Sequence, residues 1–283
     1  MKIGIIGAGK MGYTLGKHFS VSDLPDIQLV GYYSRNLLSA IDAAQFTNSN
    51  YFEMLEELCV KCDMLFLTVP DGEIKKLVAS LNELSKFLSG KIICHTSGAL
   101  SSLELSGICS DVYVYSVHPI FAVNSKMEAY KNFVDAFITI EGDLKYIDYI
   151  KVLFTNLGHN VKVISPDDKV KYHSAAVFSS NLVIGLYHMA EGILKQCGFN
   201  DIEIDLALKP LFINNANMLY ESNCKAALTG PVERCDYETL EKHLSVLQND
   251  YYDVYKIISN QLVEIADNKH NERDYSKIMD LLS

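Results

Sequence analysis

The chain has 283 residues, more than the roughly 100–200 residues of a typical single domain, so its length favours two domains. Its formal net charge of −10 argues against nucleic acid or an anionic membrane surface as a partner. Apolar residues make up 49% of the chain and charged residues 21%, as in ordinary soluble proteins, and its apolar runs fall short of the roughly 18–20 residues of a membrane span.

The first predicted element is a short apolar strand over residues 2–7 that runs into the motif Gly7-x-Gly9-x-x-Gly12. Gly7 permits a tight turn, Gly9 lets the backbone approach a pyrophosphate, and Gly12 allows the following helix to pack closely on the sheet. Free N–H groups at that helix N-terminus attract the phosphates. A simple glycine-rich turn is the alternative. The predicted dinucleotide contacts are Gly7, Ala8, Gly9, Lys10, Met11 and Gly12.

The second predicted strand, residues 27–33, ends in Ser34 and Arg35. NAD sites usually place Asp or Glu here, roughly 20 residues after the glycine motif, to bind the ribose 2′-hydroxyl. A hydroxyl donor and a planar cation suit a 2′-phosphate instead. We therefore predict NADP as the cofactor, bound by Ser34 and Arg35. An NAD site with a solvated arginine at the strand end is the alternative.

Cys59 and Cys62 form a C-x-x-C pair just before the third predicted strand. A structural zinc site needs four ligands, and the sequence offers no second pair to complete one, so we expect packing residues and no metal site; a redox pair is the alternative. The seven cysteines are odd in number and lack a framework spacing, which favours a reducing, cytoplasmic location. A strand at the N-terminus leaves no room for a signal peptide.

Up to residue 165, predicted strands alternate with helical stretches. This alternation predicts an α/β fold with a mostly parallel, doubly wound sheet. The predicted strands lie at about 2–7, 27–33, 63–69, 91–95, 112–116 and 134–140.

Three strand ends in this part carry polar or otherwise special residues: 68–71, 95–99 and 116–119. Ligands of such a sheet bind outside the carboxyl ends of its strands. The cofactor contacts predicted from these ends are Thr68, Val69, Pro70, Asp71, His95 and Thr96.

From residue 166 onward the pattern is helical and shows no strand signal. Ser165 as N-cap, Pro166 at the first helical position and Asp168 as a capping acceptor predict a long helix that runs to about Cys197. Its middle is apolar on most faces, which is typical of a helix buried all round, and we expect it to pack in a homodimer. Further all-α elements are predicted at about 203–223, 236–247 and 249–268.

The glycine motif, the Val69-Pro70-Asp71 strand end and the helical second half resemble the superfamily of 6-phosphogluconate dehydrogenase, pyrroline-carboxylate reductase and prephenate dehydrogenase. The chain is more similar to a group within it that joins a Rossmann-like NADP-binding domain to a helical domain of unknown function, number 2520, and is often labelled deazaflavin-dependent NADP oxidoreductase. This sequence has Cys235 where the group usually has glycine. The matching segments are 95–99, 116–120, 172–181 and 228–236, with Thr239 and His243.

The resemblance implies an NADP-binding Rossmann domain over residues 1–165 and a helical domain for substrate binding and dimerisation over residues 166–283. It covers nearly the whole chain. Nothing in the sequence is typical of a deazaflavin site.

Ser97 and His118 are similar to a pair in prephenate dehydrogenases, where a catalytic histidine follows a strand-end serine by about 21 residues, as here. Gly98 and Ala99 replace the Val-Lys of those enzymes, so the resemblance does not carry over their substrate. Hydride transfer to a carbonyl or imine needs a proton donor, and a histidine with an ordinary pKa of about 6.5 suits that role. A structural histidine and an ordinary turn serine are the alternatives.

The helical domain offers Lys171, His173 and Asn181 as further candidates. In related dehydrogenases a lysine and an asparagine about four residues apart on this helix assist catalysis, so the resemblance maps only loosely onto Lys171 and Asn181. We expect substrate contacts from Lys171 and His173, and a solvated Lys169. Asn181 either contacts a ligand or belongs to a core hydrogen-bond network.

Arg234 follows a Gly-Pro turn between predicted helices. An arginine can clamp a carboxylate through two hydrogen bonds, and substrates of the resembled enzymes are mostly small acids. We therefore expect Arg234 to contact the substrate; pairing with Asp236 or Glu238 is the alternative, and His243 equally suits a packed helix position.

Together these features predict an NADP-dependent oxidoreductase that transfers a hydride to or from a small polar, carboxylate-bearing substrate. Oxidative decarboxylation, reduction of an imine or ketone, and deazaflavin exchange all remain open. A non-catalytic NADP-binding sensor or assembly protein is the alternative, because a fold alone does not fix a function.

Overall fold

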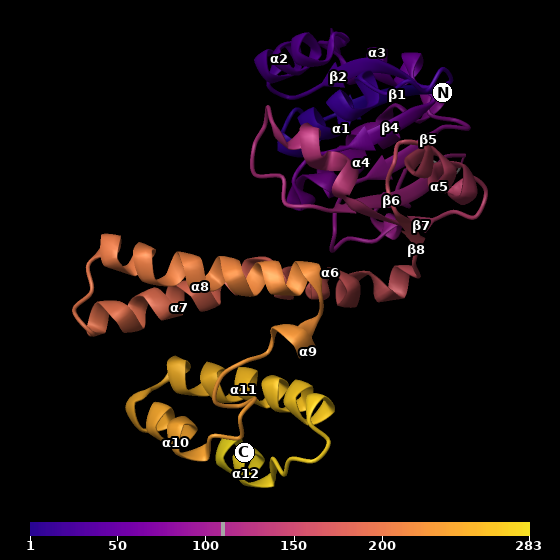
Figure 1. Cartoon of the computed structure of the whole chain (residues 1–283). Coiled ribbons are helices and arrows are strands. Elements are labelled where there is room, and N and C mark those ends of the chain that lie inside the picture. Colours follow the sequence, from indigo (N-terminus) through magenta and orange to yellow (C-terminus); the bar gives the residue numbers. More distant parts are fainter. Residues whose placement is uncertain (109–110) are drawn as a thin grey trace. The chain divides into compact units, whose positions relative to one another are not determined.

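The structure is a computed structural model that describes residues 1–108 and 111–283. These residues form two compact units, Met1–Asn181 and Leu182–Ser283. The division falls after the predicted domain boundary at residue 165, because the helix that follows the sheet belongs to the first unit. Figure 1 shows the sheet of that unit with helices on both of its faces.

The first unit is built on an eight-stranded sheet, counted over its described residues, with the order β3-β2-β1-β4-β5-β6-β7-β8. Among the described residues, all strand pairs are parallel except β6 with β7. This confirms the predicted α/β class with a mostly parallel sheet. The strands are β1 (Lys2–Ile6), β2 (Gln28–Tyr33), β3 (Asn50–Phe52), β4 (Met64–Leu67), β5 (Ile92–His95), β6 (Tyr113–Ile120), β7 (Phe137–Gly142) and β8 (Val161–Val163).

The antiparallel pair β6–β7 differs from the predicted pattern and brings polar residues together. It sets His118 opposite Thr139 and Ser116 opposite Glu141. Because alternate residues of a strand face the same side, these four side chains share one face of the sheet. β6 also runs on to Ile120, so His118 lies inside the strand and not beyond its end.

Helices cover both faces of the sheet with two apolar clusters. On one face, Tyr13, Phe19 and Phe154 pack with Phe66 of β4. On the other, Leu58 and other side chains of α3 and α4 pack against the sheet. The helices of this unit are α1 (Lys10–Ser20), α2 (Leu37–Thr47), α3 (Leu55–Lys61), α4 (Asp71–Glu83), α5 (Ile147–Asn156) and α6 (Lys169–Phe178), with short 3-10 turns η1 (Ser85–Phe87), η2 (Ser102–Leu105), η3 (Ala129–Asp135) and η4 (Pro166–Asp168).

Cys59 and Cys62 are fully buried in the second of these clusters. Burial raises the pKa of the Cys59 thiol to about 11 and that of Cys62 to about 12. Both thiols are therefore protonated at neutral pH, a state that is poorly nucleophilic. Among the described residues, no three His, Cys, Asp or Glu side chains are grouped so as to hold a metal ion.

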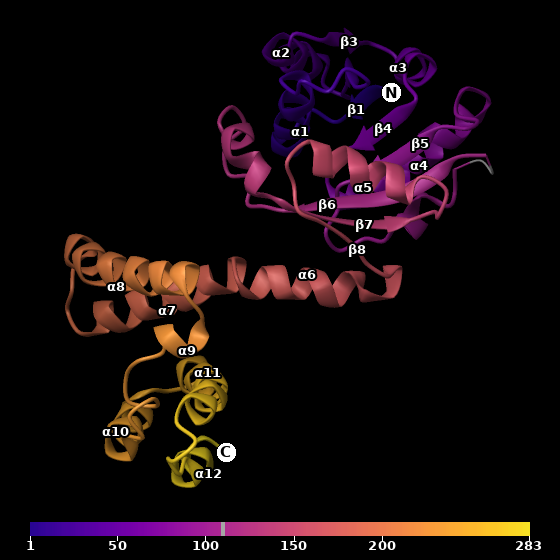
Figure 2. The ribbon, with the colours of Figure 1, turned by 45° about the vertical axis from the view of Figure 1, so that its right-hand side comes forward.

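The described residues of the second unit form helices and the loops between them. Figure 2 shows α10, α11 and α12 packed on one another, around a core that includes Leu240, Val263 and Ile278. None of the described helices combines the length and apolar character needed to cross a bilayer. The helices are α7 (Asn181–Gln196), α8 (Asp201–Glu221), α9 (Cys224–Ala227), α10 (Tyr237–Val246), α11 (Asp250–Lys269) and α12 (Ser276–Leu282).

The predicted single helix from 166 to about Cys197 is wrong. α6 ends at Phe178 and α7 begins at Asn181. The hydroxyls of Ser179 and Ser180 both donate to the Ala176 carbonyl, and such back-bonding competes with the helical ladder. The expected burial is also absent from the described single chain, in which apolar side chains such as Ile184 of α7 are exposed.

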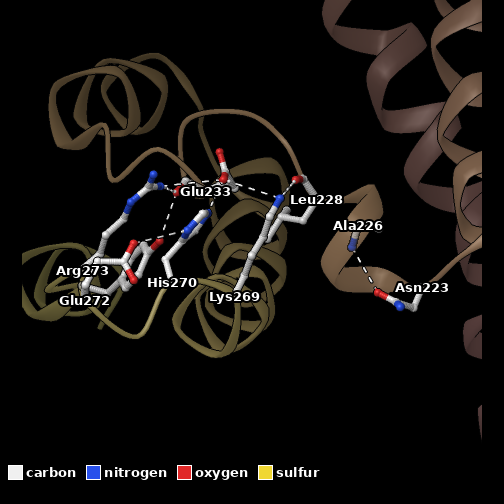
Figure 3. A network of polar contacts seen from close by, with 9 residues as sticks. Asn223, Ala226, Leu228, Glu233, Lys269, His270, Glu272 and Arg273 are labelled. Atoms are coloured by element: carbon white, nitrogen blue, oxygen red, sulfur yellow. Dashed lines mark hydrogen bonds and ion pairs between the residues drawn. The ribbon is translucent and has the colours of Figure 1, made fainter.

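A carboxylate organises the loop between α9 and α10 (Figure 3). Glu233 Oε1 lies 2.5 Å from His270 Nε2, 3.5 Å from Lys269 Nζ and 3.8 Å from Arg273 Nη1. The backbone carbonyl of Glu233 accepts a hydrogen bond of 3.0 Å from Tyr275. These contacts fasten the loop to the end of α11.

Candidate functional site

The glycine turn after β1 has the geometry that the motif predicts. Gly7 has a φ of +110°, a conformation that side chains rarely adopt. A Cβ on Gly12 would lie 2.2 Å from Gly7 O and 2.8 Å from Thr68 Oγ1, so α1 can approach the strand only without one. Gly9 is the N-cap of α1 and has no side-chain oxygen to bond the first-turn N–H groups, which suits them to an anion.

Next to this turn lies a cleft of about 700 Å³. Its walls come from the ends of β1, β2 and β4 and from α4. The predicted cofactor residues that line it are Gly7, Ala8, Gly9, Ser34, Arg35, Thr68, Val69 and Pro70. Of the others, Lys10, Met11 and Gly12 form the first turn of α1, Asp71 begins α4, and His95 and Thr96 lie at the end of β5.

At one end of the cleft, Arg35 meets a carboxylate that the sequence reading missed. Arg35 Nη1 lies 2.6 Å from Glu73 Oε2, and Lys76 Nζ lies 3.0 Å from Glu73 Oε1. The hydrogen bond from Lys76, and after it the charge of Arg35, lower the pKa of Glu73. Glu73 and Lys76 lie on α4 and line the cleft.

Lys169 of α6 is buried, with 1% of its surface exposed, so the expectation of a solvated side chain is wrong. Its Nζ donates to Ser116 Oγ at 2.5 Å, and Ser116 Oγ donates in turn to the carbonyl of Ser97 at 3.3 Å. Burial lowers the pKa of Lys169 to about 8, against the opposing influence of Glu141 and Asp71. Lys169 therefore holds a proton that it can give up near neutral pH.

Glu141 of β7 is a fully buried carboxylate close to this lysine. One of its oxygens accepts a 2.7 Å hydrogen bond from Ser102 N, and the other accepts a 2.7 Å bond from Ser102 Oγ. A buried carboxylate needs such donors and a nearby opposite charge. Glu141 thus compensates for part of the cost of burying the Lys169 ammonium.

His118 is held by Tyr172 of α6. The Tyr172 hydroxyl lies 2.6 Å from His118 Nδ1 and accepts a 2.9 Å hydrogen bond from Thr139 Oγ1. The hydroxyl keeps its own proton to donate to Nδ1, and in that arrangement the ring proton lies on Nε2. Burial, and then the positive charge of Lys169, lower the pKa of His118 to about 3. The imidazole is neutral at pH 7, whereas the predicted acid role assumed an ordinary pKa.

Two imidazoles converge on Gly98. A Cβ on Gly98 would lie 2.3 Å from His173 Nδ1 and 2.8 Å from His118 Nε2. The two rings meet edge to face, with centroids 5.6 Å apart. His173 Nδ1 is buried and finds no hydrogen-bond partner among the described residues. Such a buried polar atom is costly unless a ligand or water completes it.

Ser97 connects the cluster of Lys169, His118 and His173 to the cleft. Its hydroxyl donates to Asp71 Oδ2 at 2.8 Å and accepts from Leu100 N at 3.0 Å. Asp71 follows Pro70, which lines the cleft. The lysine and histidine cluster thus lies along the same carboxyl edge of the sheet as the glycine turn.

His95 has both ring nitrogens engaged by the chain that follows it. Nδ1 accepts from Ser97 N at 3.2 Å, and Nε2 lies 3.0 Å from the carbonyl of Ser101. Burial lowers the pKa of His95 to about 4, so the ring is neutral. These contacts hold the Ser97–Ser101 loop in place. Both ring nitrogens of His95 are therefore engaged by the loop.

Family models match both parts of the chain. A Rossmann-like domain model matches residues 1–119, and the domain of unknown function DUF2520 matches residues 136–262. The chain joins a Rossmann-like domain to a DUF2520 domain. The Rossmann-like match contains the glycine turn and His118, and the DUF2520 match contains Lys169 and His173.

Solved structures share this fold along nearly the whole chain. A protein from Thermotoga maritima is 24% identical, with a TM-score of 0.74 and coverage of 95% of this chain and 99% of that one. A protein from Bacteroides fragilis, named as a candidate NADP oxidoreductase, is 24% identical, with a TM-score of 0.67 and coverage of 93% and 98%. The NADP-bound pyrroline carboxylate reductase of Plasmodium falciparum is 17% identical, with a TM-score of 0.58 and coverage of 95% and 96%. None of the curated proteins matches the sequence.

The other predicted residues of the DUF2520 part lie on the surface of the described chain. Lys171 is exposed on α6, two residues beyond the buried Lys169. Asn181 is exposed at the start of α7, so it joins no core network in the single chain. Arg234 is exposed beside Glu233, and Asp236 is the nearby carboxylate that its charge influences.

Proposed function

We propose that the protein is an NADP-dependent oxidoreductase that transfers a hydride to or from a small polar, carboxylate-bearing substrate. The observation that carries the proposal is Lys169, a buried lysine with a pKa lowered to about 8, at the same sheet edge as a glycine-rich cleft. A lysine tuned in this way suits acid–base work near neutral pH.

The glycine turn fits a dinucleotide. A Cβ on Gly9 would find its nearest neighbour, Thr68 O, at 4.0 Å, which leaves the space over the turn open for a pyrophosphate. Ser34 and Arg35 would face the ribose end and support NADP over NAD. When bound, the reduced nicotinamide supplies the hydride.

Side chains of the cluster take separate roles in the reductive direction. Lys169 gives a proton from Nζ, directly or through Ser116 Oγ, to the oxygen or nitrogen on which charge develops. His118 stays neutral and donates a hydrogen bond from Nε2. His173 Nδ1 bonds the substrate. In the oxidative direction, neutral Lys169 accepts the proton.

A carboxylate-bearing imine or ketone is the substrate class we favour. The structural neighbour from Plasmodium falciparum is named for a pyrroline carboxylate, which joins an imine to a carboxylate. A neighbour from Myxococcus stipitatus, 14% identical, is named an imine reductase. An imine nitrogen takes up a proton as it is reduced, and Lys169 would supply it.

We further propose that the helical unit forms a homodimer in the cytoplasm. Apolar side chains on α7 and α8, such as Ile184, Ile202 and Leu206, are exposed in the single chain. Exposed apolar side chains in such number are typical of a protein interface.

Binding and turnover together test the proposal. Titrations with NADPH and NADH would measure affinity, and a screen of imines and ketones with or without a carboxylate would follow NADPH absorbance. We expect NADPH binding and turnover of at least one carboxylate-bearing substrate. NADPH binding without turnover of any substrate in both directions would favour a sensor, and failure to bind either dinucleotide would overturn the cofactor assignment.

A further inference from the structure

Glu73 pairs with Arg35, the residue that we expect to bind the 2′-phosphate of NADP. Its carboxylate lies 2.6 Å from Arg35 Nη1 and 3.0 Å from Lys76 Nζ, and all three residues line the cleft. Arg35 is 76% exposed at its side chain, whereas Glu73 is 24% exposed. The carboxylate is thus the less exposed member of the pair.

The carboxylate has support that does not depend on Arg35. Glu73 lies in the first turn of α4, where the helix dipole favours a negative charge. Lys76, one turn further along the same helix, contacts its other oxygen. Loss of the Arg35 contact would therefore leave Glu73 paired and ionised.

We infer that Glu73 sets the cofactor preference of this cleft by competing with the 2′-phosphate of NADP for Arg35. This inference rests on the proposed function. Binding of the phosphate would take Arg35 away from Glu73, and Lys76 would keep the carboxylate balanced. NAD lacks the phosphate and binds without breaking the pair. Glu73 consequently lowers the affinity for NADP and leaves that for NAD nearly unchanged.

The carboxylate of this site does not come from the residue after β2, where NAD sites usually have Asp or Glu. Ser34 stands at the end of β2, and Glu73 reaches the same end of the cleft from α4. The carboxylate and the cation that would read a 2′-phosphate therefore come from different elements. Their balance, and not one residue type, decides the selectivity.

Glu73→Gln tests the inference because it removes the charge and keeps the shape. We expect the dissociation constant for NADPH to fall about fivefold and that for NADH to stay the same, since exposed ion pairs are worth about that factor or less. Glu83→Gln removes a carboxylate from the other end of α4 on the same cleft and serves as the control. Its effect on NADPH binding should stay below about twofold, because charges beyond the Debye length are screened.

A double-mutant cycle with Arg35→Ala shows whether Glu73 acts through the arginine. Glu73→Gln should strengthen NADPH binding in the wild-type background and have little effect when Arg35 is alanine. An equal gain in both backgrounds, or no gain in the wild type, would overturn the inference. If neither dinucleotide binds the wild-type protein, the proposed function fails instead, so the two failures are distinct.

Discussion

Lys169 Nζ lies 2.5 Å from Ser116 Oγ and is buried, whereas Lys171, two residues along the same helix, is exposed. The pair offers a matched comparison of two lysines on α6. We expect Lys169→Met to lower kcat/KM by about 10²–10⁴-fold, the usual effect of removing a general acid, and to leave NADPH binding intact. Lys171→Met should retain wild-type kinetics. Steady-state kinetics and a dinucleotide titration check both, and a fully active Lys169→Met protein would remove the proposed acid.

The pH dependence of turnover reports the same group. In the reductive direction the active form carries a proton on Lys169, whose pKa is lowered to about 8. We expect kcat/KM to be level below pH 8 and to fall about tenfold per unit above it. The oxidative direction should show the opposite slope below pH 8. A reductive profile without a break between pH 7 and pH 9 would contradict this assignment.

Gly9 and Gly12 separate cofactor binding from folding. In Gly12→Ala the new Cβ would lie 2.2 Å from Gly7 O, so we expect a loss of about 1–3 kcal/mol in the free energy of unfolding and weak binding. In Gly9→Ala the nearest atom is 4.0 Å away, so the fold should keep its stability. NADPH binding should nevertheless weaken at least tenfold, because the methyl group blocks the approach of the pyrophosphate. Urea unfolding and titration measure the two effects, and tight binding by Gly9→Ala would argue against a phosphate over this turn.

Cys235 stands in a left-handed conformation, with a φ of +60°, at a position where the resembled group usually has glycine. A side chain costs about 1–2 kcal/mol in this conformation. Cys235 Sγ recovers part of this through a 3.2 Å hydrogen bond to Asp274 O. We expect Cys235→Gly to raise the free energy of unfolding by up to about 1 kcal/mol. Cys235→Ala keeps the Cβ and loses the bond, so it should lower stability; equal effects of the two substitutions would show that the backbone is unstrained.

One buried histidine, His95, and two partly buried ones, His18 and His118, should make the protein sensitive to acid. Burial lowers the pKa of His18 and His95 to about 4 and that of His118 to about 3. A group with a lowered pKa in the folded state binds its proton more readily when unfolded. The contribution of these histidines to the free energy of unfolding is therefore complete above about pH 6.5. It falls as the pH drops from there toward the lowered pKa values, by about 1.4 kcal/mol per pH unit for each histidine.

Urea unfolding at pH 7, 6 and 5 measures this loss. His118→Asn should reduce the loss of unfolding free energy per pH unit by the contribution of one histidine, about 1.4 kcal/mol. His188→Gln, which removes an exposed histidine of α7, should leave the slope unchanged. An unaltered slope in His118→Asn would mean that His118 is protonated in the folded protein.

The glycine turn and the class of the sheet could be predicted because they depend on neighbours in the sequence. Gly7, Gly9 and Gly12 act within one strand, turn and helix, and their spacing alone defines the turn. The break between α6 and α7 depends on the hydroxyls of Ser179 and Ser180, which the apolar pattern around them concealed.

The site residues that were missed depend on contacts between distant segments. Arg35 and Glu73 meet only because β2 ends, and α4 begins, at the same edge of the sheet. Lys169 is buried because α6 packs against β6 and its antiparallel partner, and the sequence predicted no antiparallel pair. The spacing of Lys169 and His173, four residues apart on one helix face, was the available signal.

The antiparallel register of β6 and β7 constrains how this protein can tolerate insertions and deletions. Ser116 and His118 face Glu141 and Thr139 in strict alternation. Deleting one residue within β7 would turn the carboxylate and the threonine to the opposite face, away from Lys169 and Tyr172. The segment over residues 122–128, before η3, pairs with no strand, whereas η3 carries the buried Phe133. Length variation among descendants of this chain should therefore accumulate in residues 122–128 and stop at η3.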